Sequence, residues 1–272
     1  MLSQRVVIPG GMTFHVRCHG EIDAPPLVFL HGVLSAAISY DVLCEGLARH
    51  RRVVAIDQRG HGDTDHADDY AWARWVEDVA AVIESLGLGV VDLVGHSMGA
   101  AHAARFAALN PGAVRRLALI EGGIGRPNAP SEPDYWARVA QLFPPEGFAT
   151  LREFVTLATS LFPRADPAIV DRSTANFVRA ANGRWSWPSQ ADMKMFGTRT
   201  EPPPDVERLR ASVGCPTLVA RAEHSEVFVG DDYKTVAAEY TNGQHRLLAG
   251  AGHMVMWEGV DNTLAVLDDF LG

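Results

Sequence analysis

Short, wholly apolar runs recur along this chain, and they constrain its fold more than any other feature. They lie in the segments PLVFLHG (26–32), RRVVAIDQRGHG (51–62), VVDLVGHSMG (90–99), VRRLALIEGG (114–123) and CPTLVARA (215–222). Continuous apolar runs of this length are typical of strands that are buried on both faces of a parallel sheet. We therefore expect a mainly parallel sheet at the centre of the molecule.

Helical segments alternate with these runs. The segment 70–87 places its apolar residues at spacings of three and four, the alanine-rich segment 98–111 ends at Pro111, and 262–272 is amphipathic. Strands alternating with helices predict right-handed crossovers and an α/β fold with helices on both faces of the sheet. At the N-terminus, two β-rich runs in 5–18 flank Gly10 and Gly11, which predicts a hairpin.

The alternation stops between residues 124 and 212. This stretch has a helical pattern, contains several prolines and shows no strand-like run. We predict a helical cap, 124–212, inserted into a core made of 1–123 and 213–272. The aromatic residues of the predicted cap either line a pocket or form the cap's own core; they include Trp136, Phe143, Trp185 and Trp187.

Composition limits the partners. The formal net charge is −9, so phosphate backbones and anionic lipids are repelled, and we predict a small-molecule substrate with no nucleic-acid or membrane partner. The N-terminus has no signal-peptide pattern, and we expect a cytoplasmic location. Cys18, Cys44 and Cys215 are scattered and lack CxxC spacing, which favours reduced thiols over a zinc site or a disulfide framework. We expect no metal and no cofactor, and the sequence does not predict the oligomeric state.

The pattern GHSMG (95–99) lies between a predicted buried strand and a predicted helix, which is the context that a nucleophilic serine requires. A sharp strand-to-helix turn lifts the serine hydroxyl clear of the sheet, at the positive end of the helix. Gly95 and Gly99 would relieve the crowding that such a turn creates. The segment therefore predicts that Ser97 is a nucleophile.

With these motifs in order, the chain resembles the α/β-hydrolase family over nearly its whole length. The motifs are LHG (30–32), DQRGHG (57–62), GHSMG (95–99) and GAGH (250–253). The resemblance implies that Ser97 is the nucleophile, that His253 is its base and that a carboxylate orients the histidine. A serine needs such a base, and the pKa of histidine lies near neutrality.

An oxyanion hole needs backbone N–H groups aimed at the developing charge. By the resemblance, the N–H group of Met98 supplies one donor and that of Val33, after His31 and Gly32, supplies the second. His31 is expected to fix this loop. Asp57, Arg59 and His61 are expected to form a structural turn network, and HGDTDH (61–66) is not expected to bind a metal because its histidines lack helical spacing.

Two glutamates compete for the role of the acid. The usual place for this residue in the family falls at Ser225, which cannot act as a carboxylate, and Glu226 follows it. The rival is Glu121, at the end of the predicted strand beside that of Ser97, and some family members take the acid from that strand. Both positions lie at the carboxyl edge of the sheet. We favour Glu226 and keep Glu121 as the alternative.

The predicted activity is that of a serine hydrolase cleaving an ester, thioester or lactone of a small, largely apolar substrate through an acyl-serine intermediate. Cleavage of a C–C bond remains open, whereas related enzymes with an aspartate nucleophile are disfavoured by Ser97. A second possibility is a cofactor-free oxygenase or lyase in which the histidine acts on the substrate directly. A ligand-binding pseudoenzyme is the third.

Overall fold

In the computed structural model, which describes residues 1–124, 133–187, 205–228 and 231–272, eight strands form one sheet in the order β1-β2-β4-β3-β5-β6-β9-β10. The pairs β1–β2 and β2–β4 are antiparallel, and the remaining pairs are parallel. The strands are β1 (Leu2–Val7), β2 (Thr13–His19), β3 (Pro26–Leu30), β4 (Arg52–Ile56), β5 (Val91–His96), β6 (Val114–Ile120), β9 (Thr217–Ala222) and β10 (Gly243–Leu248). The predicted parallel sheet and N-terminal hairpin are confirmed.

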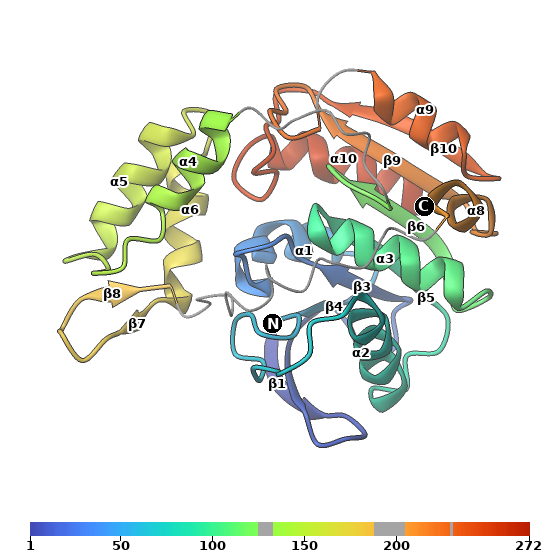
Figure 1. Cartoon of the computed structure of the whole chain (residues 1–272), viewed down its shortest axis with the longest axis horizontal. Coiled ribbons are helices and arrows are strands. Elements are labelled where there is room, and N and C mark those ends of the chain that lie inside the picture. The colour runs from blue at the N-terminus through green and yellow to red at the C-terminus, as the bar shows by residue number, and fades with distance from the viewer. Residues whose placement is uncertain (125–132, 188–204, 229–230) are drawn as a thin grey trace.

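Helices cover both faces of the sheet, as predicted (Figure 1). Leu27 and Phe29 of β3 belong to the apolar core shared with α1 and α10, whereas Val28 and Leu30 belong to the core shared with α2 and α3. Burial on both faces is the reason that the strand has no polar alternation. The covering helices are α1 (Asp41–Leu47, after the 3-10 helix η1, Ala37–Tyr40), α2 (Trp72–Ser85), α3 (Met98–Leu109), α8 (Val206–Ala211), α9 (Asp232–Ala238) and α10 (Val260–Leu271).

The segment 133–187, here called the cap segment, lies beside the sheet at one end of the molecule (Figure 1). Its elements are α4 (Pro133–Gln141), α5 (Leu151–Leu161), α6 (Pro167–Ser173), the 3-10 helix η2 (Thr174–Asn176), β7 (Val178–Arg179) and β8 (Trp185–Ser186). The expectation of a region without strands is corrected, since β7 and β8 pair as a small antiparallel hairpin. Strands of two residues are too short to produce a recognisable alternation.

Helix α8 falls inside the stretch predicted as cap, yet it packs against α3 of the sheet. The Arg210 side chain donates hydrogen bonds to the Ile124 carbonyl, and the Thr241 hydroxyl donates to the Ala211 carbonyl. These contacts tie α8 to the chain beside the sheet. The predicted division at residue 212 remains a proposal, and α8 is the element that argues for an earlier boundary.

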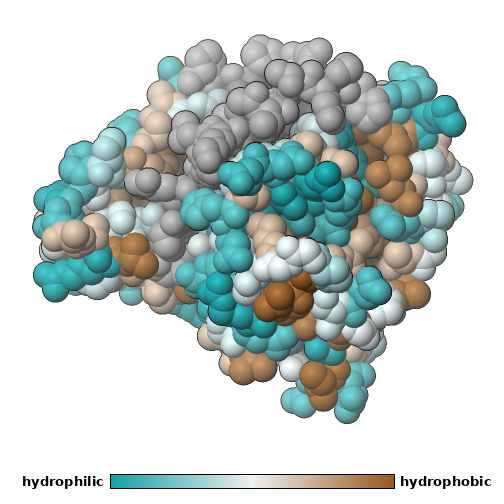
Figure 2. Space-filling model, turned by 60° about the horizontal axis from the view of Figure 1, so that its bottom comes forward, coloured by the Kyte–Doolittle hydropathy of each residue, from teal (hydrophilic) through white to brown (hydrophobic). Residues whose placement is uncertain are grey.

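The exposed apolar residues of the described chain are separated by hydrophilic ones on the face that Figure 2 displays. Scattered single apolar residues are normal on a protein surface. Among the described helices, none combines the length and the apolar character that crossing a bilayer requires.

Candidate active site

Ser97 stands between β5 and α3 in a backbone conformation that few L residues adopt, with φ 53° and ψ −113°. A Cβ atom on Gly95 would lie 2.4 Å from the Gly99 carbonyl oxygen, and one on Gly99 would lie 2.3 Å from the Leu30 carbonyl oxygen. The crowding predicted from the GHSMG pattern is therefore present. The Ser97 N–H group donates to the Ile120 carbonyl at 2.9 Å, which joins the turn to the neighbouring strand β6.

His253 lies in the loop between β10 and α10, and 6% of its surface is exposed. Its ring sits beside the ring of His96, the residue before Ser97, with 4.9 Å between the ring centroids. The His96 Nε2–H group donates to the His253 carbonyl at 2.9 Å, and the Tyr40 hydroxyl donates to His96 Nδ1 at 2.7 Å. This chain of contacts brings His253 beside the turn that carries Ser97.

Glu121 is the carboxylate that contacts this histidine. The His253 Nδ1–H group donates to Glu121 Oε2 at 2.8 Å. The Ala222 N–H group donates to Oε1 at 2.7 Å, and the Ser225 hydroxyl donates to Oε2 at 2.5 Å. Glu121 is fully buried and has a positive φ of 56°, so its backbone turns sharply at the end of β6. Two donors from the end of β9 and the loop after it, and one from the loop after β10, thus fix the orientation of the carboxylate.

Glu226, the acid favoured from the sequence, has a different partner in the structure. Both oxygens of Glu226 accept hydrogen bonds from Arg138 Nη2 of α4, at 2.6 and 2.5 Å. The loop after β9 directs the Ser225 hydroxyl towards Glu121, and the next side chain reaches the cap segment instead. The preference for Glu226 rested on adjacency in sequence, which does not specify the direction of a side chain in an irregular loop.

The two residues predicted to supply the oxyanion-hole N–H groups belong to different segments, the start of α3 and the loop after β3. Met98 is the first residue of α3, where the N–H group has no partner within the helix. A Cβ atom on Gly32, beside Val33, would lie 3.3 Å from the Cβ atom of Ser97. The side chains of Val33 and Met98 pack against the same small cluster, formed by Tyr70 and Trp75. The loop before Val33 therefore borders Ser97, as the family resemblance implies.

His31 holds this loop in place. Its Nδ1–H group donates to the Gly32 carbonyl at 2.7 Å, and its Nε2 atom accepts from the Gln58 N–H group at 3.0 Å. Burial lowers the pKa of His31, which favours the neutral ring that these two bonds require. The Tyr40 hydroxyl accepts from the Gly32 N–H group at 3.3 Å. Sequence reasoning anticipated His31 but missed Tyr40, which no motif marks.

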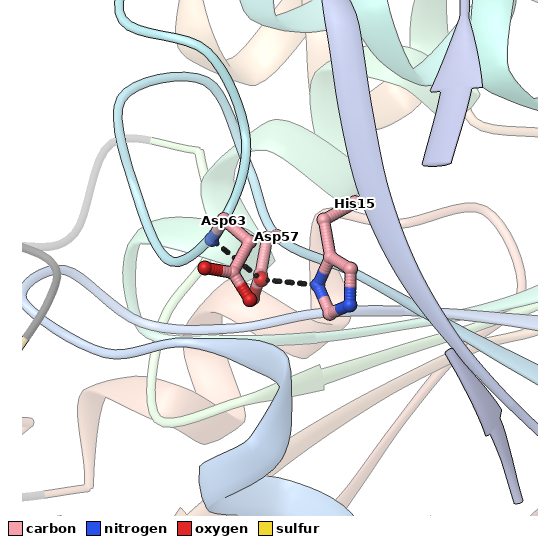
Figure 3. Close-up of side chains that lie close together, drawn as sticks. All are labelled: His15, Asp57 and Asp63. Carbon is pink, nitrogen blue, oxygen red and sulfur yellow. Dashed lines mark hydrogen bonds and ion pairs between the residues drawn. The ribbon is translucent and has the colours of Figure 1, made fainter. Parts of the chain in front are cut away.

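The turn network at Asp57 also has the geometry of a structural element (Figure 3). The ligand-type atoms of His15, Asp57 and Asp63 lie within 4.8 Å of one another. Asp57 Oδ2 already accepts from His15 Nδ1 at 2.6 Å and from the Asp63 N–H group at 3.1 Å, while Oδ1 accepts from the Ala37 N–H group at 2.6 Å. Burial raises the pKa of Asp57, but the His15 hydrogen bond and nearby charges outweigh it and lower the pKa. Both oxygens are thus committed to holding the turn.

A small apolar pocket, with a volume of about 40 Å³, lies between the cap segment and the loops beside Ser97. Val33 and Met254 are adjacent in sequence to Gly32 and His253, so the pocket borders the site. Of the aromatic residues considered for this role, Phe143 and Trp187 line it, whereas Trp136 is exposed and packs against Tyr135. The lining residues are Val33, Leu34, Ser35, Ser39, Val139, Leu142, Phe143, Phe154, Trp187, Met254, Met256 and Trp257.

Three arginines of the cap segment pair with glutamates outside it. Arg138 pairs with Glu226, Arg164 with Glu258 at 3.3 Å, and Arg172 with Glu45 at 2.6 Å. In the first of these pairs, Arg138 binds the carboxylate of Glu226, which was favoured from the sequence as the catalytic acid. Among the described residues, these ion pairs link the cap segment to the loops after β9 and β10 and to α1.

Comparison with known proteins agrees with this fold. A family model described as alpha/beta hydrolase fold matches residues 25–260. Relatives include a 2-(acetamidomethylene)succinate hydrolase from Mesorhizobium japonicum, 36% identical over 126 residues (44% of this chain and 42% of the relative). A 2-hydroxy-6-oxo-2,4-heptadienoate hydrolase from Pseudomonas putida is also 36% identical over 126 residues, covering 44% of this chain and 45% of the relative.

The mouse (Mus musculus) sn-1-specific diacylglycerol lipase ABHD11 is 34% identical over 104 residues, which is 38% of this chain and 34% of the relative. The chain therefore matches less than half the length of each of these three relatives. Among solved structures, an E-2-(acetamidomethylene)succinate hydrolase superposes with a TM-score of 0.85 at 24% identity, covering 99% of this chain and 98% of the other. A likeness at this identity bears on the fold.

Proposed function

Since the chain belongs to the alpha/beta hydrolase family and is an enzyme of that fold, we propose that it is a serine hydrolase that cleaves an ester, thioester or lactone of a small, largely apolar substrate. Ser97 is the proposed nucleophile, His253 its base and Glu121 the acid that orients the histidine. Met98 and Val33 supply the proposed oxyanion-hole N–H groups. Glu226 has no catalytic part in this proposal.

The observation that carries the proposal is the 2.8 Å contact between His253 Nδ1 and Glu121 Oε2. A carboxylate accepts hydrogen bonds but does not donate them, so this contact keeps the hydrogen on Nδ1 and leaves the lone pair on Nε2. Nε2 can then take the proton of the Ser97 hydroxyl as the oxygen attacks a carbonyl carbon. The negative charge of Glu121 stabilises the imidazolium that forms.

The cycle has two halves. In the first, the Ser97 oxygen bonds to the carbonyl carbon, and the carbonyl oxygen takes negative charge beside the N–H groups of Met98 and Val33. Collapse breaks the bond to the alcohol or thiol, which leaves with the proton held by His253. In the second half, His253 removes a proton from water, which attacks the acyl group and releases Ser97 and a carboxylic acid.

The relatives support the hydrolytic class in general terms, since their names describe lipase activity and hydrolysis of several kinds of substrate. One observation keeps a second candidate open. An acid at the end of β6 also suits a non-hydrolytic enzyme in which His253 removes a proton from the substrate and Ser97 only binds it. The two candidates differ in whether Ser97 becomes acylated.

Fluorophosphonate labelling tests the proposal. The probe is added to the wild-type protein and to the Ser97→Ala and His253→Ala variants, and the intact mass is measured over time. We expect one adduct on the wild type, none on Ser97→Ala and a rate reduced by at least about 10³-fold for His253→Ala. A folded wild-type protein that stays unlabelled would contradict the hydrolase proposal, and oxygen consumption with candidate substrates would then test the second candidate.

A further inference from the structure

We propose that Ser225 is a positioning residue that keeps Glu121 ionised and aimed at His253. The inference rests on the proposed function, and it assigns a role to the residue that occupies the position where the acid was expected. Ser225 is 5% exposed, and the hydrogen bonds of its hydroxyl among the described residues run to Glu121, Val227 and Phe228. It would act through Glu121.

The first step concerns the direction of the Ser225 hydroxyl hydrogen. A serine hydroxyl has one hydrogen to donate and two lone pairs that accept. The N–H groups of Val227 and Phe228 both donate to Ser225 Oγ, at 3.2 and 2.8 Å. Both acceptor positions are therefore used, and the hydrogen is left to point at Glu121 Oε2, 2.5 Å away. The loop that follows β9 thus presets Ser225 as a donor.

The second step concerns the charge of Glu121. Burial disfavours a carboxylate anion, whereas hydrogen bonds donated to the anion favour it. A protonated Glu121 would need an acceptor for its hydrogen, but Ala222 offers an N–H group and Ser225 has no free lone pair. Only His253 remains as an acceptor among these three partners. The arrangement therefore favours the ionised acid together with a histidine that carries its hydrogen on Nδ1.

The third step concerns geometry. Ser225 and His253 donate to the same oxygen, Oε2, while Ala222 holds the other oxygen. Loss of the Ser225 hydroxyl would leave Oε2 with the histidine alone and would free the carboxylate to rotate and to take up a proton. The expected defect is therefore in the charge and orientation of the acid, not in substrate binding.

Several other ionisable groups lie near this carboxylate and its histidine. The pKa of Tyr135, which contacts the His253 ring, is raised by burial and then by the charge of Glu121, so its phenol stays neutral. The His96 ring is held between the Tyr40 hydroxyl and the His253 carbonyl. Glu226 and Glu258 are each paired with a cap arginine. Burial raises the pKa of Glu258, so the acid limb is compared between Ser225→Ala and the wild type, in which Glu258 is the same.

The test compares the pH dependence of the fluorophosphonate labelling rate in Ser225→Ala, Ser225→Thr and wild-type protein. For Ser225→Ala we expect a rate reduced about tenfold to a hundredfold at neutral pH, because hydrogen bonds to charged groups are worth about 1.5–3 kcal/mol. We also expect the midpoint of the acid limb to move to higher pH, because the carboxylate–imidazole pair binds a proton more tightly without the donor. Ser225→Thr retains a hydroxyl and should restore most of the rate and the midpoint.

Thr263→Val is a matched control, because Thr263 is buried and its hydroxyl donates to the Gly259 carbonyl, away from Glu121. Should Ser225→Ala fail to fold, Ser225→Cys provides a weaker donor of similar size and should give an intermediate rate. A wild-type rate and midpoint in Ser225→Ala, while His253→Ala is inactive, would overturn the inference and leave the proposed function intact. An unlabelled wild type would instead overturn the proposed function.

Discussion

The Nδ1 atom of His253 lies 2.8 Å from Oε2 of Glu121, although 132 residues separate them along the chain. Glu121 reaches this position from the end of β6, and His253 reaches it from the loop after β10. The contact identifies which of two candidate glutamates stands beside the histidine. Substitution of Glu121 and of Glu226 therefore compares the two residues directly.

Glu121→Gln should slow Ser97 labelling by about 10³-fold or more, because an amide can hold His253 in the wrong tautomer and cannot stabilise the imidazolium. Glu226→Gln is the matched control and should label within about twofold of the wild type, since it alters an ion pair that is partly exposed. The measurement is the second-order labelling rate of each folded variant. Equal rates for the two variants would contradict the assignment of Glu121.

Gly95→Ala should destabilise the protein by at least about 2 kcal/mol and abolish labelling, because the added Cβ atom would overlap the Gly99 carbonyl. Gly214→Ala offers a matched control, since a Cβ atom there meets no atom within 4 Å. Denaturant unfolding measures both variants. A Gly95→Ala protein with wild-type stability would show that the turn relaxes around the new methyl group.

His61 should make folding depend on pH. Burial lowers the pKa of His61 to about 3, so the folded protein excludes a proton that the unfolded chain binds below about pH 6.5. Stability from this residue is complete above that pH and is lost as the pH falls towards 3. Between pH 7 and pH 5, the unfolding free energy should fall by about 2 kcal/mol more in the wild type than in His61→Gln.

Denaturant titrations at several pH values check this difference. His66→Gln removes an exposed histidine from the same loop and should change the pH dependence little. Parallel curves for the wild type and His61→Gln would mean that the folded protein accommodates the protonated ring.

The preference of the enzyme for acyl chains of a given length should depend on the apolar pocket. Val139 of α4 lines the pocket, and Val139→Ala removes two methyl groups from the lining. The kcat/KM of p-nitrophenyl esters with longer acyl chains should therefore rise relative to that of the acetate. The expected gain in the ratio of kcat/KM values is about fourfold for each additional methylene that fits. Val155→Ala, on α5 but outside the pocket lining, is the control and should leave the ratio unchanged. An unchanged ratio in Val139→Ala would exclude this pocket as the acyl site.

The sequence predicted those elements whose residue pattern is set by burial or crowding within a short segment. Double-sided burial made the strands of the parallel sheet visible as apolar runs, and the crowding at Gly95 and Gly99 made the turn around Ser97 recognisable. His253 followed from the GAGH motif and the family resemblance. In each case a short segment carries both the constraint and its signature.

The acid could not be chosen in the same way, because its position depends on contacts between distant segments. Glu121 and Glu226 both follow a strand, and the choice depends on the turn of the backbone at Glu121 and on the direction of one side chain in the loop after β9. The β7–β8 hairpin and the packing of α8 likewise depend on tertiary contacts.

The three proposed catalytic residues follow strands that differ in how well they are paired and buried. Ser97 and Glu121 follow the adjacent inner strands β5 and β6, and the Ser97 N–H group bonds to the residue before Glu121. His253 follows β10, which pairs on one side only and whose residues are exposed except for the last. Local opening is easiest where few buried contacts must break. On warming, this edge should detach before the sheet melts, so inactivation by heat should precede loss of secondary structure and be reversed on cooling.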